Sequence, residues 1–355
     1  MRELRTPQGS SITLPIQWNL RLYAATPIAL LHDALAEDGV DSSPALAAAG
    51  LSLAQARSPE TLISSQQLLD ACKVISSMGM EAPFAFRSGL RTRLTYFGMY
   101  GFALMSAPDM RTMLQFAVEQ QALKASLVRL WAQRRGGEVA IGVDPLSHLD
   151  MDLRLYRFLV EMHFGLIHRG WCDLTGVDFT PLRLCVTFPQ CASIREVAAS
   201  LNVDILYEQQ VNALVFDASW LDVRPQFGNL IAHDSVRNVC ANLAAQLKEQ
   251  SGLAGRIGES MVTQYGRIPS VRGMASALGM SEREVRRKLR AEGTSYREIY
   301  DDVRSQVAMK YLRDTTLPVE SIAAAIGFDD AANFRRAFRR WTGKRPLNTG
   351  SSSRH

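Results

Sequence analysis

The sequence predicts two domains of different fold class: an α+β domain over residues 1–250 and an all-α domain over residues 251–346, followed by a flexible tail over 347–355. Two observations support this division. Helical and strand-like patterns are mixed in the first 250 residues without regular alternation, as in α+β folds. Beyond residue 250 a seven-residue pattern occurs twice, 48 residues apart, each time before an arginine-rich helical segment.

The bulk composition excludes several classes of protein. The chain has 355 residues, 47% of them apolar, enough for about two or three domains with sizeable cores. No run approaches the roughly 18 consecutive apolar residues of a membrane span. The first residues contain no apolar segment typical of export. We therefore expect a cytoplasmic protein with no membrane partner.

Cysteine, histidine and glycine patterns give no support to an enzyme, a cofactor or a metal site. The five cysteines are widely spread without a C-x-x-C pair, so buried reduced thiols are expected. His163 and His168 are five residues apart, which places them on different faces of a helix. Phosphate-binding glycine loops, nucleophile elbows and zinc-protease motifs are absent from the sequence. We expect a protein without catalytic residues.

The first 250 residues contain five helical and five strand-like segments. Arg134–Glu138 contains two glycines between two strand-like runs, which predicts a hairpin. The expected helices cover Pro27–Ala36, Ser65–Met78, Met110–Leu123, Leu153–His168 and Ser193–Leu201, and the expected strands cover Val128–Gln133, Val139–Val143, Leu182–Phe188, Ile205–Tyr207 and Ala213–Phe216.

A further amphipathic helix, over about residues 234–249, ends this domain. Apolar residues recur along it at helical spacing. Such a helix can close a domain or pair with a second copy of the chain, and the sequence leaves both open. The apolar positions are Val236, Val239, Cys240, Leu243 and Leu247.

Positive charge is concentrated toward the C-terminus. From Ser251 onward there are 19 basic and 11 acidic residues, whereas the preceding residues include 21 basic and 24 acidic ones. This asymmetry favours a polyanionic partner for the C-terminal domain.

The repeated pattern has the residue types of a helix-turn-helix. A small alanine lets two helices cross closely, a glycine adopts positive φ at the turn, and the apolar positions form a shared core. The two copies are Met274-Ala275-x-x-Leu278-Gly279-Met280 and Ile322-Ala323-x-x-Ile326-Gly327-Phe328.

An amphipathic helix with a cationic face follows each copy. The first starts at a capping box of Ser281 and Glu284, and Val285 and Leu289 form its apolar side. The second is expected to have Asp329 as N-cap. Its apolar side consists of Phe334, Phe338 and Trp341. The opposite faces carry Arg283, Arg286, Arg287 and Arg290 in the first helix, and Asn333, Arg335, Arg336, Arg339 and Arg340 in the second.

Two interpretations of these faces compete. Solvated charged surfaces are common on helices, but the equivalent placement in a repeat favours two recognition helices. In the DNA major groove an arginine can bond guanine and an asparagine can bond adenine, while other arginines neutralise phosphates.

A long helix is expected between the two units. Ser295 and Glu298 form a capping box, and an apolar seam runs from Tyr296 to Tyr311. A helix of about 18 residues is roughly 27 Å long. This suits two recognition helices in successive major-groove segments about 34 Å apart. Pro318 suits the first turn of the next helix.

Five segments near the C-terminus match a known pattern: Ala275–Gly279 with Ser281, Glu292–Tyr296, Tyr311-Leu312, Ile322–Phe328 and Asn333–Pro346. With them, Ser251–Pro346 resembles the AraC/XylS family of bacterial transcription regulators. The resemblance implies an all-α domain of seven helices with two helix-turn-helix units that bind double-stranded promoter DNA. It also implies base contacts from Arg283, Arg286, Arg287, Ala331, Ala332, Asn333 and Arg336.

Two departures from this pattern have consequences. Ala331 and Ala332 can make only apolar contacts, for example with a thymine methyl, so the second unit is expected to contact fewer bases. After Pro346, residues 347–350 replace the usual aromatic-arginine ending, so the last helix is expected to end early.

The N-terminal domain resembles the arabinose-binding-like sensing domain of one branch of this family. The segments that carry the resemblance are Arg93–Ser106 and Asn212–Asp217. It implies binding of a small effector, and often dimerisation. Arg93, Tyr96, Tyr100 and Trp131 are candidate pocket residues for a small polar or anionic effector, with core packing as the alternative for the aromatic residues.

The sequence thus predicts a transcription regulator, with promoter DNA, an unknown small effector and RNA polymerase as partners and a homodimer as an open alternative. An activator is expected, although nothing in the sequence separates activation from repression. An architectural DNA-binding protein without effector is the main competing hypothesis. A DNA alkylation-repair protein would need clustered or activated cysteines, and the sequence has neither.

Overall fold

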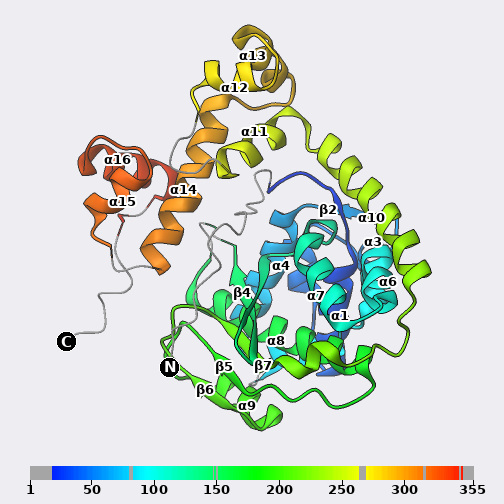
Figure 1. The fold of residues 1–355 in the computed structure, drawn as a ribbon. Coiled ribbons are helices and arrows are strands. Elements are labelled where there is room, and N and C mark those ends of the chain that lie inside the picture. Colours follow the sequence, from blue (N-terminus) through cyan, green and yellow to red (C-terminus); the bar gives the residue numbers. More distant parts are fainter. Residues whose placement is uncertain are drawn as a thin grey trace, which may run out of the picture. The chain divides into compact units, whose positions relative to one another are not determined.

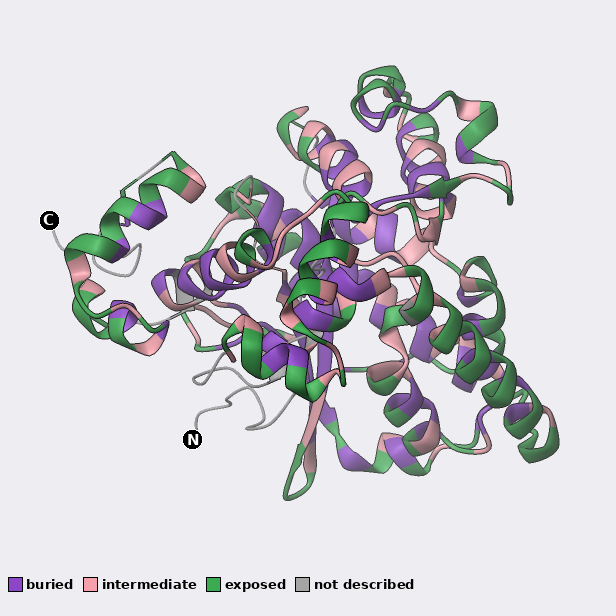
Figure 2. Ribbon diagram, turned by 90° about the horizontal axis from the view of Figure 1, so that it is seen from above, coloured by how far each residue is buried: buried purple, intermediate pink, exposed green. Residues whose placement is uncertain are grey.

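A computed structural model (Figure 1) describes residues 18–79, 83–146, 148, 151–263, 269–314, 317–343 and 345–346. Its contacts form two compact units, one mainly of residues 19–146 and 152–247 and the other mainly from Lys248 onward. Along the helices, buried residues lie on one side and exposed residues on the other (Figure 2). Among the described residues, no helix is long and apolar enough to cross a membrane.

A five-stranded mixed sheet forms one layer of the N-terminal unit. β3 (Val128–Arg135) and β4 (Glu138–Pro145) form the predicted hairpin, which Gly136 closes at φ 60°. The remaining strands are β5 (Arg183–Cys185), β6 (Asp204–Leu206) and β7 (Ala213–Asp217), and the order is β3-β4-β7-β5-β6. β5 and β6 are parallel neighbours, and the other described pairs are antiparallel. The mixed helix-and-strand class predicted for this domain is confirmed.

Helices make up the rest of this unit, with a short ribbon of β1 (Tyr23–Ala24) and β2 (Leu62–Ile63). The α-helices are α1 (Thr26–Glu37), α2 (Ser43–Ala48), α3 (Leu53–Ala56), α4 (Ser65–Ser77), α5 (Phe84–Arg91), α6 (Gly98–Ser106), α7 (Met110–Glu119), α8 (Leu153–Thr175), α9 (Ala192–Leu201) and α10 (Leu230–Gln250). Among the described residues there are also three short 3₁₀ helices, η1 (Leu94–Phe97), η2 (Gln121–Leu123) and η3 (Ala218–Asp222).

Several predicted boundaries are wrong. The helix expected over Leu153–His168 continues as α8 to Thr175, because Trp171 and Leu174 extend its buried side, and it ends at Gly176 with φ 72°. The helix expected over Met110–Leu123 is divided into α7 and η2. The strand expected over Leu182–Phe188 is shortened to β5.

α5 and α8 cross with their backbones in contact. A β-carbon on Gly89 would lie 2.0 Å from the carbonyl oxygen of Met162, and one on Gly165 would lie 2.2 Å from that of Phe86. Both distances are too short for any side chain, so the two glycines make this crossing possible.

The predicted amphipathic helix near residue 240 exists as α10 but begins earlier, at Leu230. Its first half packs within the N-terminal unit, where His233 Nδ1 lies 2.9 Å from the carbonyl oxygen of Ala103, and Val236 and Cys240 are buried. Val239 and Leu243 are 41% and 38% exposed. The apolar side of α10 therefore contains buried positions that pack within the unit and other positions that are exposed to solvent.

The C-terminal unit is helical, as predicted. Its core includes Ile257, Val303, Ile322 and Phe334, all buried. The described residues of this unit contain six helices, and the stretch after Pro346, where the last helix was expected to end early, lies outside the described residues. The six are α11 (Gly252–Thr263), α12 (Val271–Ala277), α13 (Glu282–Ala291), α14 (Tyr296–Asp314), α15 (Val319–Ala325) and α16 (Ala331–Thr342).

Candidate nucleic-acid interface

The helix pairs α12–α13 and α15–α16 have turns with the same backbone geometry. Gly279 and Gly327 both adopt left-handed φ, 64° and 78°. The amide of Met280 donates to the Ala275 carbonyl at 2.9 Å, and the amide of Phe328, 48 residues later, donates to the Ala323 carbonyl at 2.9 Å. This is the glycine-dependent closure in which left-handed backbone returns the chain onto the last helical turn.

The second turn is one residue longer than the first. Ser281 is the N-cap of α13, but the N-cap of α16 is Asp330, whose carboxylate accepts from the Asn333 amide at 2.6 Å. The prediction of Asp329 as N-cap is therefore wrong. The 48-residue spacing holds only as far as the turn, and the N-caps are 49 residues apart. The buried residues show the true spacing, since Val285 corresponds to Phe334, 49 residues later. An offset of 49 pairs Arg283 with Ala332, Arg286 with Arg335, Arg287 with Arg336, and Arg290 with Arg339.

α13 exposes all four predicted arginines on the side opposite its buried residues. Arg286 lies 3.8 Å from the Glu282 carboxylate. For Arg283, Arg287 and Arg290, no ion pair is found among the residues that the structure describes. The Ser281 hydroxyl accepts from the Glu284 amide at 3.2 Å, while the Glu284 carboxylate lies 3.4 Å from Lys288 Nζ. The helix therefore presents guanidinium groups that are free to meet an anion.

α16 carries its arginines differently, because two of them pair with acids of neighbouring helices. Arg335 donates to Glu320 of α15 at 2.6 Å, and Arg340 donates to Asp301 of α14 at 3.0 Å. Both arginines are about half exposed. Their charge is already partly compensated within the unit.

The start of α16 contains a chain of polar contacts. The Asn333 amide group donates to the Asp330 carboxylate, and its oxygen accepts from Arg336 at 2.6 Å. Ala332 is exposed, whereas Ala331 is half-buried and packs against the core. For Arg339, which is exposed, the described residues offer no ion pair.

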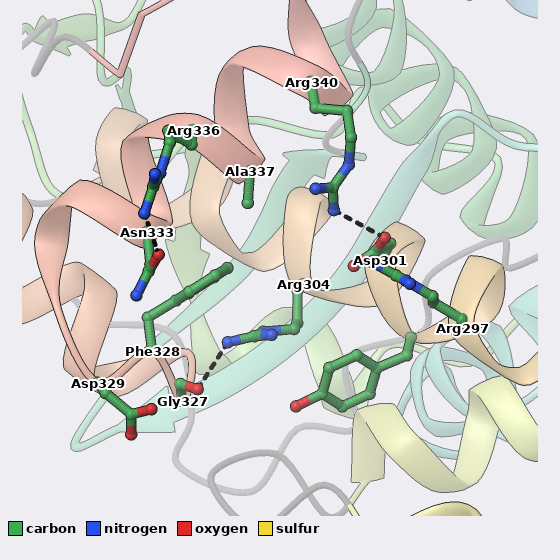
Figure 3. A pocket seen from close by; sticks show the side chains of 11 residues that line it. Arg297, Asp301, Arg304, Gly327, Phe328, Asp329, Asn333, Arg336, Ala337 and Arg340 are labelled. Atoms are coloured by element: carbon green, nitrogen blue, oxygen red, sulfur yellow. Dashed lines mark hydrogen bonds and ion pairs between the residues drawn. The ribbon is translucent and has the colours of Figure 1, made fainter.

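An open groove of about 600 Å³ lies between α14, the α15–α16 turn and α16 (Figure 3). Arg304 of α14 forms its floor and donates to the carbonyl oxygens of Ile326 at 2.8 Å and Gly327 at 2.7 Å. Its guanidinium carbon lies 3.6 Å from the ring centroid of Phe328. Arg304 thus satisfies the carbonyl end of α15 and fixes the second turn.

Sequence reasoning missed Arg304, together with the acids Asp301 and Glu320. An arginine next to Val303 fits an exposed helix flank equally well, so the sequence contains little signal for its buried position. The pairing of Arg335 with Glu320 spans two helices, and periodicity within one helix cannot show it.

The four candidate effector residues lie in different surroundings in the described part of the N-terminal unit. Arg93 pairs with Asp173 at 2.9 Å on an open surface, and Tyr96 is 44% exposed. Tyr100 and Trp131 are buried, and the Tyr100 hydroxyl donates to the Ala117 carbonyl at 2.9 Å. Of the three cavities described, none is lined by more than one of the four. The burial of Tyr100 and Trp131 favours the core-packing alternative for these two residues, and the effector role of the four residues stays a prediction.

The chain is similar to known regulators along nearly its whole length. It is 27% identical to an ornithine utilization regulator of Pseudomonas aeruginosa, covering 94% of this chain and 97% of the relative. It is 26% identical to the HTH-type transcriptional regulator VqsM of the same organism, over 76% of this chain and 84% of the relative. The crystal structure of the transcriptional regulator CdpR from Pseudomonas aeruginosa aligns with a TM-score of 0.48 at 22% identity, covering 90% of this chain and 96% of that one.

Two family descriptions match the two domains of the chain. Residues 274–351 match a helix-turn-helix domain. Residues 39–225, more than half of the chain, match the arabinose-binding domain of AraC transcription regulators. The chain therefore belongs to the AraC family of transcription regulators that carry this N-terminal domain.

Proposed function

We propose that the protein is a sequence-specific DNA-binding regulator in which α12–α13 and α15–α16 are two helix-turn-helix units. In this proposal α13 and α16 enter successive segments of the major groove. The observation that supports it best is the repeated turn, with the same hydrogen bonds 48 residues apart and an arginine-rich helix after each. The 19 residues of α14 correspond to about 28 Å of helix, a suitable spacer between the two units.

The two units contribute unequally to recognition. α13 offers Arg283, Arg286 and Arg287 for bases or phosphates, because these side chains are exposed and at most loosely paired. α16 offers the exposed methyl of Ala332 and the bonded pair of Asn333 and Arg336. We infer that most base discrimination comes from α13 and that α16 mainly fixes the position of the domain on DNA.

The N-terminal domain is proposed to bind a small effector that shifts the population of DNA-binding arrangements. An effector can do this only if it binds one arrangement more tightly than another. The relative named for ornithine utilization supports a response to a small metabolite. The exposed Val239 and Leu243 of α10 support a homodimer, and RNA polymerase is the expected partner on the promoter. In this role the protein is a binding protein of the cytoplasm rather than an enzyme.

Selection of binding sites from random DNA by the full-length protein, near physiological salt, tests this function. We expect two short motifs centred about ten base pairs apart. The stronger motif should weaken in the Arg287→Ala variant, while Arg57→Ala, on an exposed arginine of the N-terminal unit, should leave both unchanged. Binding without sequence enrichment would instead support an architectural DNA-binding protein.

A further inference from the structure

The N-terminal unit contains a small, partly open cavity with mostly apolar walls. It lies between α1, α4, α5, α8 and the segment 124–127, and its volume is about 70 Å³. The apolar walls include Leu30, Leu31, Leu68, Leu159, Met162 and Leu166. Four helices that are distant in sequence therefore line one cavity.

One cation faces this space. Lys124 lines the cavity, and its Nζ lies 5.3 Å from the ring centroid of Phe97 and 5.8 Å from that of Tyr100. No carboxylate lines the cavity among the described residues, and within them Lys124 forms no ion pair. Burial lowers the pKa of Lys124 to about 8. The two rings compensate only a fraction of the cost of placing an ammonium group away from water.

The other polar groups of the cavity are neutral or already bonded. His163 Nδ1 lies 2.8 Å from the Leu159 carbonyl, and burial, with the nearby charge of Lys124, lowers the pKa of His163 to about 3. The hydroxyls of Ser88 and Thr92 donate to carbonyl oxygens of their own helix at 2.9 and 3.1 Å. The described lining therefore has one positive charge and no negative charge.

We propose that this cavity is the effector site and that it binds a small aliphatic monocarboxylate, with the carboxylate on Lys124 and the alkyl group among the leucines. The inference rests on the proposed function as an effector-controlled regulator. An anion would compensate the partly buried ammonium, and an alkyl group would be removed from water against the apolar walls. A cavity of about 150 Å³ can hold benzene, so a volume near 70 Å³, less than half as large, suits only a very short acid of about two or three carbons.

The same lining disfavours two other classes of effector. A sugar would bury several hydroxyls, but the walls are mostly hydrocarbon and the serine and threonine donors are already used. A diamino acid would bring ammonium groups next to Lys124 with no carboxylate among the described lining residues to pair with them.

Thermal unfolding of the full-length protein with a ligand series tests the proposal. The probes are acetate, propionate, butyrate, valerate and hexanoate at equal ionic strength, with butyramide, L-arabinose and L-ornithine as comparisons. We expect acetate or propionate to raise Tm by at least about 2 °C at saturation. The neutral amide, the sugar and the diamino acid should leave Tm unchanged.

Lys124→Met identifies the site, with Lys73→Met, an exposed lysine of the same unit, as matched control. Lys124→Met should bind the acid at least about tenfold more weakly and should itself raise the Tm of the free protein, which also shows that it folds. Lys124→Gln provides a second variant that removes the same charge. The control should bind the acid like the wild type.

Two results would overturn the inference: a carboxylate response that persists in both Lys124 variants, or a response to arabinose or ornithine alone. DNA binding, measured separately, distinguishes the two proposals. If the protein binds DNA but no carboxylate, the cavity inference fails and the proposed function stands. If it binds a carboxylate through Lys124 but no specific DNA, the proposed function fails instead.

Discussion

The two units of this protein use positive charge in opposite ways. In the N-terminal unit, arginines bond carboxylates that the fold brings to them: Arg87 and Arg91 both donate to Asp38 at 2.8 Å, and Arg129 donates to Asp144 at 2.6 Å. Hydrogen bonds from Arg87 and Arg91 lower the pKa of Asp38. Arginine there holds elements together, whereas in the C-terminal unit much of it points to solvent and is available to a polyanion.

The same contrast divides the C-terminal unit. α13 exposes Arg283, Arg287 and Arg290, which no acid compensates within the described residues, while in α16 Arg335 and Arg340 pair with acids of α15 and α14. At positions that correspond with an offset of 49 residues, α13 therefore has more uncompensated positive charge than α16. An arginine-rich helix in a sequence is not yet a free cationic surface, since neighbours decide how much of the charge remains.

The largest effect is expected from removing the free charge of α13. Replacing Arg283, Arg287 and Arg290 by alanine should reduce DNA affinity by at least about a hundredfold and lower the salt slope by about two to three. Fluorescence anisotropy over a salt series measures both quantities. The side chains are exposed, so Tm should hardly change. An unchanged salt slope would show that α13 does not contact DNA.

A matched pair of single substitutions compares the two helices directly. Arg287→Ala should cost about 1–3 kcal/mol of binding and relax preference at one base position. Arg336→Ala, at the equivalent position of α16, should cost less because Arg336 already bonds Asn333 at 2.6 Å. Binding to a panel of single-base variants measures both. Equal losses of binding free energy in the two variants would contradict the proposal that the two units contribute unequally. If Arg287→Ala weakens binding to all DNA sequences by the same factor, Arg287 contacts a phosphate rather than a base.

Lys124 allows the use of positive charge in the two units to be compared through protein stability, because burial destabilises its charged form. Its pKa of about 8 in the folded protein lies below the ordinary lysine value of about 10.4, so the unfolded chain binds more protons between these pH values. Wild-type stability should rise with pH across this window. Lys124→Met should be more stable by about 3 kcal/mol near neutral pH, and the difference should shrink toward about pH 10. Denaturant unfolding of both proteins at several pH values measures this, and a constant difference would contradict the assignment.

Some of these features follow from sequence and others depend on tertiary packing. The turns at Gly279 and Gly327 were predictable because few residue types suit a left-handed turn between crossing helices. The hairpin at Gly136 was predictable for a similar reason. The N-cap at Asp330 was missed because one additional residue in the second turn changes the offset of the repeat from 48 to 49 residues. The apolar residues show this offset, since Phe334 and Phe338 follow Val285 and Leu289 by 49 residues.

The N-terminal unit shows more clearly which features cannot be predicted from sequence patterns. α6 is apolar on several faces, with Tyr100 and Leu104 buried and Met99 and Phe102 exposed, so it has little amphipathic signal. α2 and α3 span only six and four residues, too short for a periodic pattern. The cavity at Lys124 is formed by helices that are distant along the chain, and no local pattern reports such packing.

The smallest effect is expected from releasing an arginine of α16. Glu320→Gln breaks the ion pair with Arg335, which is exposed and therefore contributes little to stability. The freed guanidinium should raise DNA affinity by about twofold to fivefold and steepen the salt slope slightly. Glu282→Gln on α13 is the matched control, since its pair with Arg286 is longer, 3.8 Å, and there is less charge to release. If both variants bind DNA equally well, Arg335 already exchanges its partner for phosphate, and the difference between the helices lies in base contacts rather than in available charge.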